Sequence, residues 1–206
     1  MRVVVLGGAG FIGSHCVDEL VSNTADVLVI DNLSTGLKSS INSSACFSML
    51  DVCEPELRTA VFDWGRPDAA VVLAAQTSVI RSCTEPLEDA RTNILGLISV
   101  VEMCFRLGVP YILFSSSAAV YGEQERLPIG EMRVTNPRSP YAVSKFAGEL
   151  YLKTLAQAAG VTTCIMRFSN VFGPRQRSDG EAGVVSIFAD HFARSQRVTI
   201  YGDGSQ

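Results

Sequence analysis

Histidine and paired cysteine are scarce in this sequence, and each scarcity argues against one kind of site. The 206 residues contain two histidines, His15 and His191, and three lysines. None of the six cysteines stands in a C-x-x-C pair. A zinc site or a catalytic triad built on histidine is therefore not expected, and we predict no metal site. The cysteines are expected to be reduced thiols and not a disulfide framework.

Long apolar runs and clustered positive charge are also missing. No run of 18 apolar residues is present to span a membrane, and the first predicted strand starts at residue 2, which leaves no room for a signal peptide. The formal net charge of −4 provides no basic patch for nucleic acid. We therefore expect a cytoplasmic protein whose partners include neither a membrane nor a nucleic acid.

Strand and helix patterns alternate along the chain, in which 47% of the residues are hydrophobic and 18% are charged. Strands are predicted at 2–6, 26–30, 45–49, 69–73, 110–115, 161–167 and 198–201. Helices are predicted at 11–22, 54–63, 76–106 with a break near Pro86, 140–159 and 183–196. This alternation predicts an α/β fold, a doubly wound Rossmann-like parallel sheet with helices on both faces. The polar stretches 32–44, 122–139 and 172–182 are predicted loops beyond the carboxyl ends of strands, where such sheets bind ligands.

The segment after the first strand carries a glycine motif at residues 7–13, Gly-Gly-Ala-Gly-Phe-Ile-Gly. A strand that runs into glycine-spaced turns and then a helix presents backbone amides to a pyrophosphate. The second strand is followed by Asp31, and an acid at this place accepts hydrogen bonds from the ribose hydroxyls of NAD and repels the 2′-phosphate of NADP. The sequence therefore predicts a dinucleotide site that prefers NAD.

A second motif joins a serine, a tyrosine and a lysine. Ser117 is the last of three serines at the end of the strand predicted at 110–115. Tyr141 and Lys145 lie one helical turn apart on one face of the predicted helix 140–159. A nearby cation lowers the pKa of a phenol, so we expect Lys145 to lower the pKa of Tyr141 toward neutral pH. Ser117 can hydrogen-bond the substrate oxygen with which Tyr141 exchanges a proton, and Lys145 can also reach the nicotinamide ribose. The three residues are the predicted catalytic group.

Together these segments resemble the extended short-chain dehydrogenase/reductase family. The motifs that carry the resemblance are GGAGFIG at 7–13, DNLSTG at 31–36, LAAQ at 73–76, SSS at 115–117 with VYG at 120–122, YAVSK at 141–145 and RFSNVFGP at 167–174. They run in order over nearly all of the chain. Within the family they are most similar to the nucleotide-sugar 4-epimerases of the UDP-glucose/UDP-galactose type.

The resemblance implies a role for each matching position. Catalysis would fall to Ser117, Tyr141 and Lys145, and substrate binding to Ser117, Tyr141, Asn170 and Val184. The implied cofactor-binding positions are Gly7, Gly10, Phe11, Ile12, Gly13, Asp31, Asn32, Ser34, Thr35, Gly36, Asp51, Val52, Leu73, Ala74, Ala75, Gln76, Asn93, Ser115, Tyr141, Lys145 and Phe168.

The implied reaction is NAD-dependent epimerisation of a UDP-hexose by transient oxidation at carbon 4, with Tyr141 removing the proton from the 4-hydroxyl. Dehydratases and decarboxylases of the family carry acidic residues after the serine segment, whereas Ala118 and Ala119 stand here and cannot transfer protons. Elimination is therefore disfavoured. Two alternatives stay open: a nucleotide-sugar dehydrogenase or reductase of the same family, and a non-catalytic NAD(H)-binding protein of the same fold.

The resemblance also implies how the chain is organised. Residues 1–173 would form the NAD-binding domain with the catalytic Tyr-Lys pair. Residues 174–206 would begin a substrate-binding region, with the small C-terminal substrate lobe absent or only begun. Charged residues of the segment 170–182, which are Arg175, Arg177, Asp179 and Glu181, would belong to the sugar-nucleotide cleft.

Apolar residues at helical spacings in 90–106 and 145–159 predict a homodimer. These residues are Ile94, Leu97, Ile98, Val101, Phe146, Leu150 and Leu155.

Overall fold

The computed structural model describes residues 1–179, 183–200 and 202–204. The chain divides into two compact units, Met1–Ser169 and Asn170–Gln206. The first unit contains a sheet of six strands, and the second contains helix α7 (Val184–Ala193). Each unit is described by itself.

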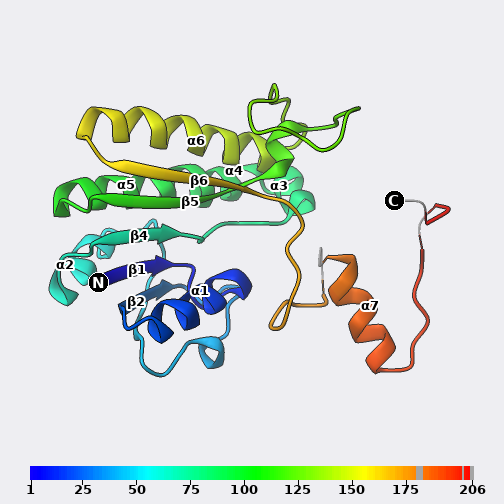
Figure 1. Ribbon diagram of the computed structural model, residues 1–206, viewed down its shortest axis with the longest axis horizontal. Helices are drawn as coiled ribbons and strands as arrows, with labels where there is room; N and C mark the ends of the chain where they lie inside the picture. Colours follow the sequence, from blue (N-terminus) through cyan, green and yellow to red (C-terminus); the bar gives the residue numbers. More distant parts are fainter. Residues whose placement is uncertain (180–182, 201, 205–206) are drawn as a thin grey trace. The chain divides into compact units, whose positions relative to one another are not determined.

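The six strands are parallel and lie side by side in the order β3-β2-β1-β4-β5-β6 (Figure 1). They are β1 (Arg2–Leu6), β2 (Asp26–Asp31), β3 (Cys46–Met49), β4 (Ala69–Val72), β5 (Tyr111–Ser117) and β6 (Thr162–Phe168). This order confirms the predicted doubly wound Rossmann-like fold. The strand order reverses between β1 and β4, and in such sheets ligands bind beyond the carboxyl ends of the strands at that reversal.

Helices connect the strands and cover the sheet. They are α1 (Phe11–Ser22), α2 (Leu57–Trp64), α3 (Val79–Thr84), α4 (Pro86–Ala90), α5 (Gly96–Leu107) and α6 (Pro140–Ala159), with short turns η1 (Lys38–Ser40), η2 (Arg91–Leu95) and η3 (Ala118–Tyr121). The predicted helices 11–22 and 140–159 match α1 and α6 residue for residue.

Alternate residues of the strands build two cores, one on each face of the sheet. On one face, Val4 and Leu6 of β1 pack with residues of α2, α5 and α6. On the other face, Val3 and Val5 pack with Val17 of α1. The near-continuous apolar strands of the sequence follow from this burial on both faces.

The long helix predicted at 76–106 is divided into four segments. The backbone breaks at Glu85, with φ −129° and ψ 59°, and α4 restarts with Pro86 at its first turn. Residues Arg91–Leu95 then form a π-helical turn, which joins α4 to α5. A π-turn inside a helix often marks a functional position, and Asn93 lies within this one.

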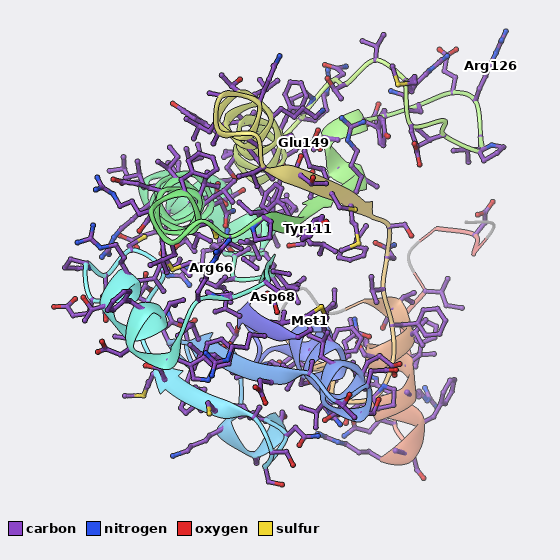
Figure 2. The ribbon with its side chains drawn as sticks, turned by 60° about the vertical axis from the view of Figure 1, so that its left-hand side comes forward. Met1, Arg66, Asp68, Tyr111, Arg126 and Glu149 are labelled. Carbon is purple, nitrogen blue, oxygen red and sulfur yellow. The ribbon has the colours of Figure 1, made fainter. Side chains whose placement is uncertain are left out.

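Helix α6 begins where local chemistry places it. Ser139 caps it by accepting a hydrogen bond at Oγ from the amide of Ala142 at 3.1 Å, and Pro140 occupies the first turn. Gly160, with φ +67°, ends the helix in the left-handed conformation. This start fixes Tyr141 in the first turn of α6. The preceding loop, 122–139, extends away from the sheet, as the position of Arg126 shows (Figure 2).

The strand predicted at 198–201 is wrong over its described part. Residues 198–200 are not in a strand, because a strand requires a hydrogen-bonded neighbour and the sheet ends at β6. Tyr201 lies outside the described residues. None of the helices described in the structure is both long and apolar enough to cross a membrane.

Candidate active site

The turn between β1 and α1 leaves no room for side chains at two of its glycines. Gly7 has φ +85°, and a Cβ there would lie 2.5 Å from the amide nitrogen of Ala74 on the loop after β4. A Cβ on Gly13 would lie 2.0 Å from the carbonyl oxygen of Gly7. Around Gly10, by contrast, only the carbonyl of Gly7 comes within 4 Å, at 3.4 Å. The turn is thus closed toward the sheet and open at Gly10, as an approach of phosphate to backbone requires.

Asp31 holds this turn to the end of β2. Its Oδ2 accepts a hydrogen bond from the amide of Ala9 at 2.9 Å, and its Oδ1 accepts one from the amide of Leu33 at 2.8 Å. Gly36 is needed nearby, because a Cβ there would lie 2.8 Å from Ala9. Each carboxylate oxygen keeps further acceptor capacity for a ribose hydroxyl.

Asn32 and Asp51 join the loops after β2 and β3. Asn32 donates from Nδ2 to Oδ2 of Asp51 at 2.6 Å, and its Oδ1 accepts from the amide of Ser34 at 2.9 Å. Burial raises the pKa of Asp51, but hydrogen bonds from the Cys53 amide and from Asn32 outweigh it and hold that pKa below its ordinary value. Val52 is buried in the core next to Gly96.

Asn93 organises the loop that follows β4. Its Oδ1 accepts from the amide of Gln76 at 2.9 Å, and its Nδ2 donates to the Gln76 carbonyl at 2.9 Å. The same Nδ2 lies 3.1 Å from Ser144 Oγ on α6 and 3.1 Å from Oδ1 of Asp89 on α4. Asn93 therefore links the predicted cofactor segment, Leu73 to Gln76, to the helix that carries Tyr141.

The three serines at the end of β5 face different partners. Ser115 donates to the carbonyl of Val72 at 3.0 Å, and Ser116 donates to Oε1 of Glu149 at 2.6 Å. Ser117 accepts from the amide of Ala119 at 3.1 Å, and its side chain is close enough to the Tyr141 phenol to lower the pKa of that phenol. The structure thus brings Ser117 and Tyr141 together, with Phe168 of β6 in register beside Ser117.

Lys145 is buried and donates from Nζ to the carbonyl of Ser115 at 2.9 Å. Its Nζ lies 6.0 Å from the centre of the Tyr141 ring. Burial lowers the pKa of Lys145 to about 8, and the negative charge of Asp89 opposes that change.

The expectation that Lys145 lowers the pKa of Tyr141 is wrong for the protein alone. Burial raises the pKa of Tyr141 above its ordinary value, and the neighbouring Ser117 side chain, which lowers that pKa, does not compensate. The ammonium group is bonded to a backbone carbonyl instead of the phenol oxygen, so its influence on Tyr141 is weak.

A buried ion pair that the sequence analysis missed lies one helical turn beyond Lys145. Glu149 is fully buried on α6, beside β5 and β6 (Figure 2), and accepts two hydrogen bonds from Arg167, at 2.8 Å and 2.7 Å. Arg167 also donates to the carbonyl of Glu131 at 3.1 Å, to which Tyr121 donates from its hydroxyl. An acid four residues after Lys145 on the same helix face was the available signal.

The remaining predicted positions are distributed over both units. Phe11 and Ile12 are half-buried in the first turn of α1, and Ser34 and Thr35 are exposed on the loop after β2. Asn170 and Val184 are exposed and belong to the second unit, as do Arg175, Arg177 and Asp179, of which Arg177 and Asp179 pair with each other. Glu181 lies outside the described residues.

Comparisons with known proteins agree on one family. The sequence profile described as "NAD dependent epimerase/dehydratase family" matches residues 3–206. The chain is 36% identical over 211 residues to the UDP-glucose 4-epimerase of Mycolicibacterium smegmatis, a match that covers all of this chain and 67% of that protein.

Solved structures show the same likeness. A UDP-glucose 4-epimerase from Thermotoga maritima, solved with UDP-glucose, has a TM-score of 0.95 and 42% identity, covering 99% of this chain and 67% of that one. The UDP-glucose 4-epimerase of Thermus thermophilus, solved with NAD, has a TM-score of 0.93 and 41% identity, covering 98% of this chain and 66% of that one. The chain therefore spans about two thirds of the length of these relatives.

Proposed function

Because the chain belongs to the NAD dependent epimerase/dehydratase family, we propose that it acts in the NAD-dependent 4-epimerisation of a nucleotide sugar of the UDP-glucose/UDP-galactose type. Ser117, Tyr141 and Lys145 carry this proposal, since they meet at the carboxyl end of β5, next to the strand at which the sheet order reverses. The relatives' names and bound molecules point to the same chemistry.

The residues around the glycine turn fit NAD. Gly10 leaves backbone open to a pyrophosphate, and Asp31 offers carboxylate oxygens to a ribose at the end of β2. When bound, NAD supplies the acceptor and donor of hydride at the sugar carbon. The resemblance implies that Lys145 would contact the nicotinamide ribose.

The chain's own residues handle the proton. Tyr141 accepts the proton of the 4-hydroxyl and later returns it, and Ser117 orients the same oxygen through a hydrogen bond. The raised pKa of Tyr141 means that the phenol is protonated at neutral pH in the protein alone. A positive charge brought close to the phenol, such as that of an oxidised nicotinamide, lowers this pKa.

The test of the proposed function has two readouts. The nucleotide that copurifies with the chain is identified by mass spectrometry after denaturation, and NAD or NADH is expected. The chain is then incubated with UDP-galactose without added cofactor, and UDP-glucose is expected to form. In a parallel reaction with added NAD, accumulation of NADH in step with an oxidised product would instead support a dehydrogenase. Bound NAD without turnover of any nucleotide sugar in either reaction would support a non-catalytic NAD(H)-binding protein.

We propose that residues 174–206 begin the substrate-binding region and that Asn170 and Val184 bind the sugar nucleotide. Their exposure leaves both side chains available for contact. Asn170→Ala is expected to raise KM for the nucleotide sugar several-fold while NAD binding is unchanged. Equal loss of NAD binding would contradict this assignment.

A homodimer through α5 and α6 is part of the proposal. Leu97 and Val101, two of the predicted interface residues, are buried in the core, but Leu150 is exposed, as are Leu95 and Val143. These three exposed apolar side chains lie on η2 and α6, two segments that contact each other, and they are the residues that a second copy is proposed to cover. Light scattering at micromolar concentration is expected to give twice the mass of the chain, and Leu150→Asp is expected to give the monomer.

We also place the protein in the cytoplasm, where its six free cysteines would stay reduced. Fractionation of expressing cells tests this placement, and the chain is expected in the cytoplasmic fraction.

A further inference from the structure

Within the part of the chain that the structure describes, two buried charges of opposite sign have no ion-pair partner in contact. The buried charged side chains there are Asp31, Asp89, Lys145 and Glu149. Glu149 is paired with Arg167, and Asp31 accepts two backbone amides. Among the described residues, Asp89 accepts hydrogen bonds from the neutral side chains of Gln76 and Asn93 alone, and Lys145 donates to the carbonyl of Ser115 alone. A buried charge is costly unless it is compensated.

Asn93 links Asp89 to Ser144, the residue that precedes Lys145 on α6. The side-chain nitrogen Nδ2 of Asn93 lies 3.1 Å from Oδ1 of Asp89 and 3.1 Å from Oγ of Ser144, the residue next to Lys145. Ser144 in turn donates to the carbonyl of Tyr141 at 2.9 Å. The carboxylate is therefore connected by side-chain contacts to the turn of α6 that carries both Tyr141 and Lys145.

The other charged side chains on elements packed against α4 and α6 have partners of their own. These pairs are Arg81 with Glu85, Arg91 with Glu88, Arg106 with Glu102, and Arg167 and Lys153 with Glu149. The titratable neutral groups on the same elements are Tyr111, Tyr121, Tyr141, Tyr151, Cys83, Cys104 and Cys164. Among these groups Asp89 is the carboxylate whose charge acts on Lys145.

We propose that Asp89 is the counter-charge of Lys145 and a positioning residue for the catalytic turn of α6. Its carboxylate keeps the buried ammonium group charged, and its contacts with Gln76 and Asn93 hold the cofactor loop against α6. The catalytic role of Asp89 rests on the proposed 4-epimerisation, whereas its role as counter-charge does not.

The negative charge of Asp89 raises the pKa of both catalytic groups, Lys145 and Tyr141. It favours the ammonium form of Lys145 and so raises the pKa of that group, and it disfavours the phenolate and so raises the pKa of Tyr141. Removing the charge lowers both pKa values. Lys145 would then lose its proton closer to neutral pH, and a larger fraction of the protein would carry an uncharged lysine at this position.

The scarcity of lysine allows a direct test. The chain has three lysines, of which Lys38 and Lys153 are exposed, so the side-chain carbon next to the amino group gives three NMR signals in a ¹³C-lysine-labelled sample. The signal that titrates near pH 8 is expected to be Lys145, and Lys145→Met identifies it by its loss. In Asp89→Asn, which keeps an acceptor oxygen for Gln76 and Asn93, this titration is expected to fall by about one pH unit.

Glu88→Gln provides the matched control, because it removes one negative charge from the preceding residue of the same helix. The Glu88 side chain is 52% exposed, so solvent screens its charge and the Lys145 titration is expected to stay unchanged. An unchanged Lys145 titration in Asp89→Asn, or an equal fall in Glu88→Gln, would overturn the proposal. The titration needs neither substrate nor turnover, so a chain without epimerase activity would contradict the proposed function alone.

A second measurement covers the case in which Asp89→Asn folds poorly. The unfolding free energies of wild type, Asp89→Asn, Lys145→Met and the double variant form a double-mutant cycle. If the two charges compensate each other, the double variant is more stable than the sum of the single losses predicts, and it folds even if Asp89→Asn does not. Strictly additive losses, or a double variant less stable than that sum, would contradict the pairing.

Discussion

The two sides of the candidate site are built in different ways. On the cofactor side, β1, the glycine turn and the end of β2 are held by backbone contacts, with Asp31 as the carboxylate that joins them. On the catalytic side, α6 is held by side-chain contacts, to β5 through Glu149 with Ser116 and to η2 through Ser144 with Asn93. The difference indicates that the cofactor side tolerates few changes of residue size, whereas the catalytic side depends on charge and hydrogen bonding.

The largest expected effect separates chemistry from binding on the catalytic side. Tyr141→Phe removes the hydroxyl that exchanges the proton and is expected to reduce turnover by at least about 10²-fold, the usual scale for a general base. The phenyl ring remains in place, so the dissociation constant of NAD should change little. Both are measured on one preparation, by epimerase assay and by calorimetry.

Ser117→Ala serves as the internal comparison, because Ser117 positions the oxygen without ionising. Its loss of turnover should be smaller than that of Tyr141→Phe. Wild-type turnover in Tyr141→Phe would contradict the assignment of the proton transfer to Tyr141.

Arg167→Ala tests how much the catalytic side depends on its buried pair. Removing Arg167 leaves the fully buried Glu149 with the hydroxyl of Ser116 and the more distant ammonium group of Lys153, at 3.8 Å, and the unfolding free energy is expected to fall by about 3 kcal/mol. Arg106→Ala is the matched control, since its pair with Glu102 is exposed and contributes less than about 1 kcal/mol. Equal losses in denaturant unfolding would contradict the importance given to burial.

The same variant predicts a pH dependence. In the folded wild type the pKa of Glu149 is lowered, because the hydrogen bonds from Arg167 and Ser116 outweigh burial. The stability that Glu149 contributes is therefore present at neutral pH and is lost as the pH falls through its folded pKa. The gap between wild type and Arg167→Ala should narrow on acidification, and a gap that widens would contradict this account.

On the cofactor side, Gly13→Ala adds a single methyl group against backbone. Because the new carbon would lie 2.0 Å from the carbonyl of Gly7, the turn must shift, at a cost of about 1–3 kcal/mol in stability and with weaker NAD binding. Gly130→Ala is the control, with nothing within 4 Å of the added carbon. Thermal unfolding and NAD titration of both variants decide whether the tight contact matters.

The smallest expected effect concerns the choice between the two dinucleotides. The carboxylate of Asp31 repels a 2′-phosphate, so NADP should bind about tenfold more weakly than NAD, or about 1.4 kcal/mol. Asp31→Asn should narrow the preference, while Asp26→Asn, at the exposed start of β2, should leave it unchanged. Tighter binding of NADP to the wild type would refute the role of Asp31.

What the sequence could predict follows the same division. The glycine turn and the start of α6 depend on neighbouring residues, so spacing alone predicted them, and strand alternation predicted the parallel sheet. The contact of Asn93 with Ser144 joins residues 51 positions apart, and that of Glu149 with Arg167 joins residues 18 apart. Such pairs form only once strands β4, β5 and β6 are in register, which no local pattern encodes. The pKa of Tyr141 was mispredicted for a related reason, since burial is set by the whole fold.

The π-helical turn at Arg91–Leu95 fixes the length of the chain between β4 and β5. The amide of Gly96 bonds to the carbonyl of Arg91, five residues back, so this turn holds one residue more than a regular helical turn. Loss of that residue would restore regular winding and rotate everything that precedes it by about 100° relative to α5. Asn93 would then swing away from Gln76 and Ser144 without any change in its identity. Homologous chains that keep the Asn93 contacts should therefore tolerate substitution in this segment far better than a single-residue deletion.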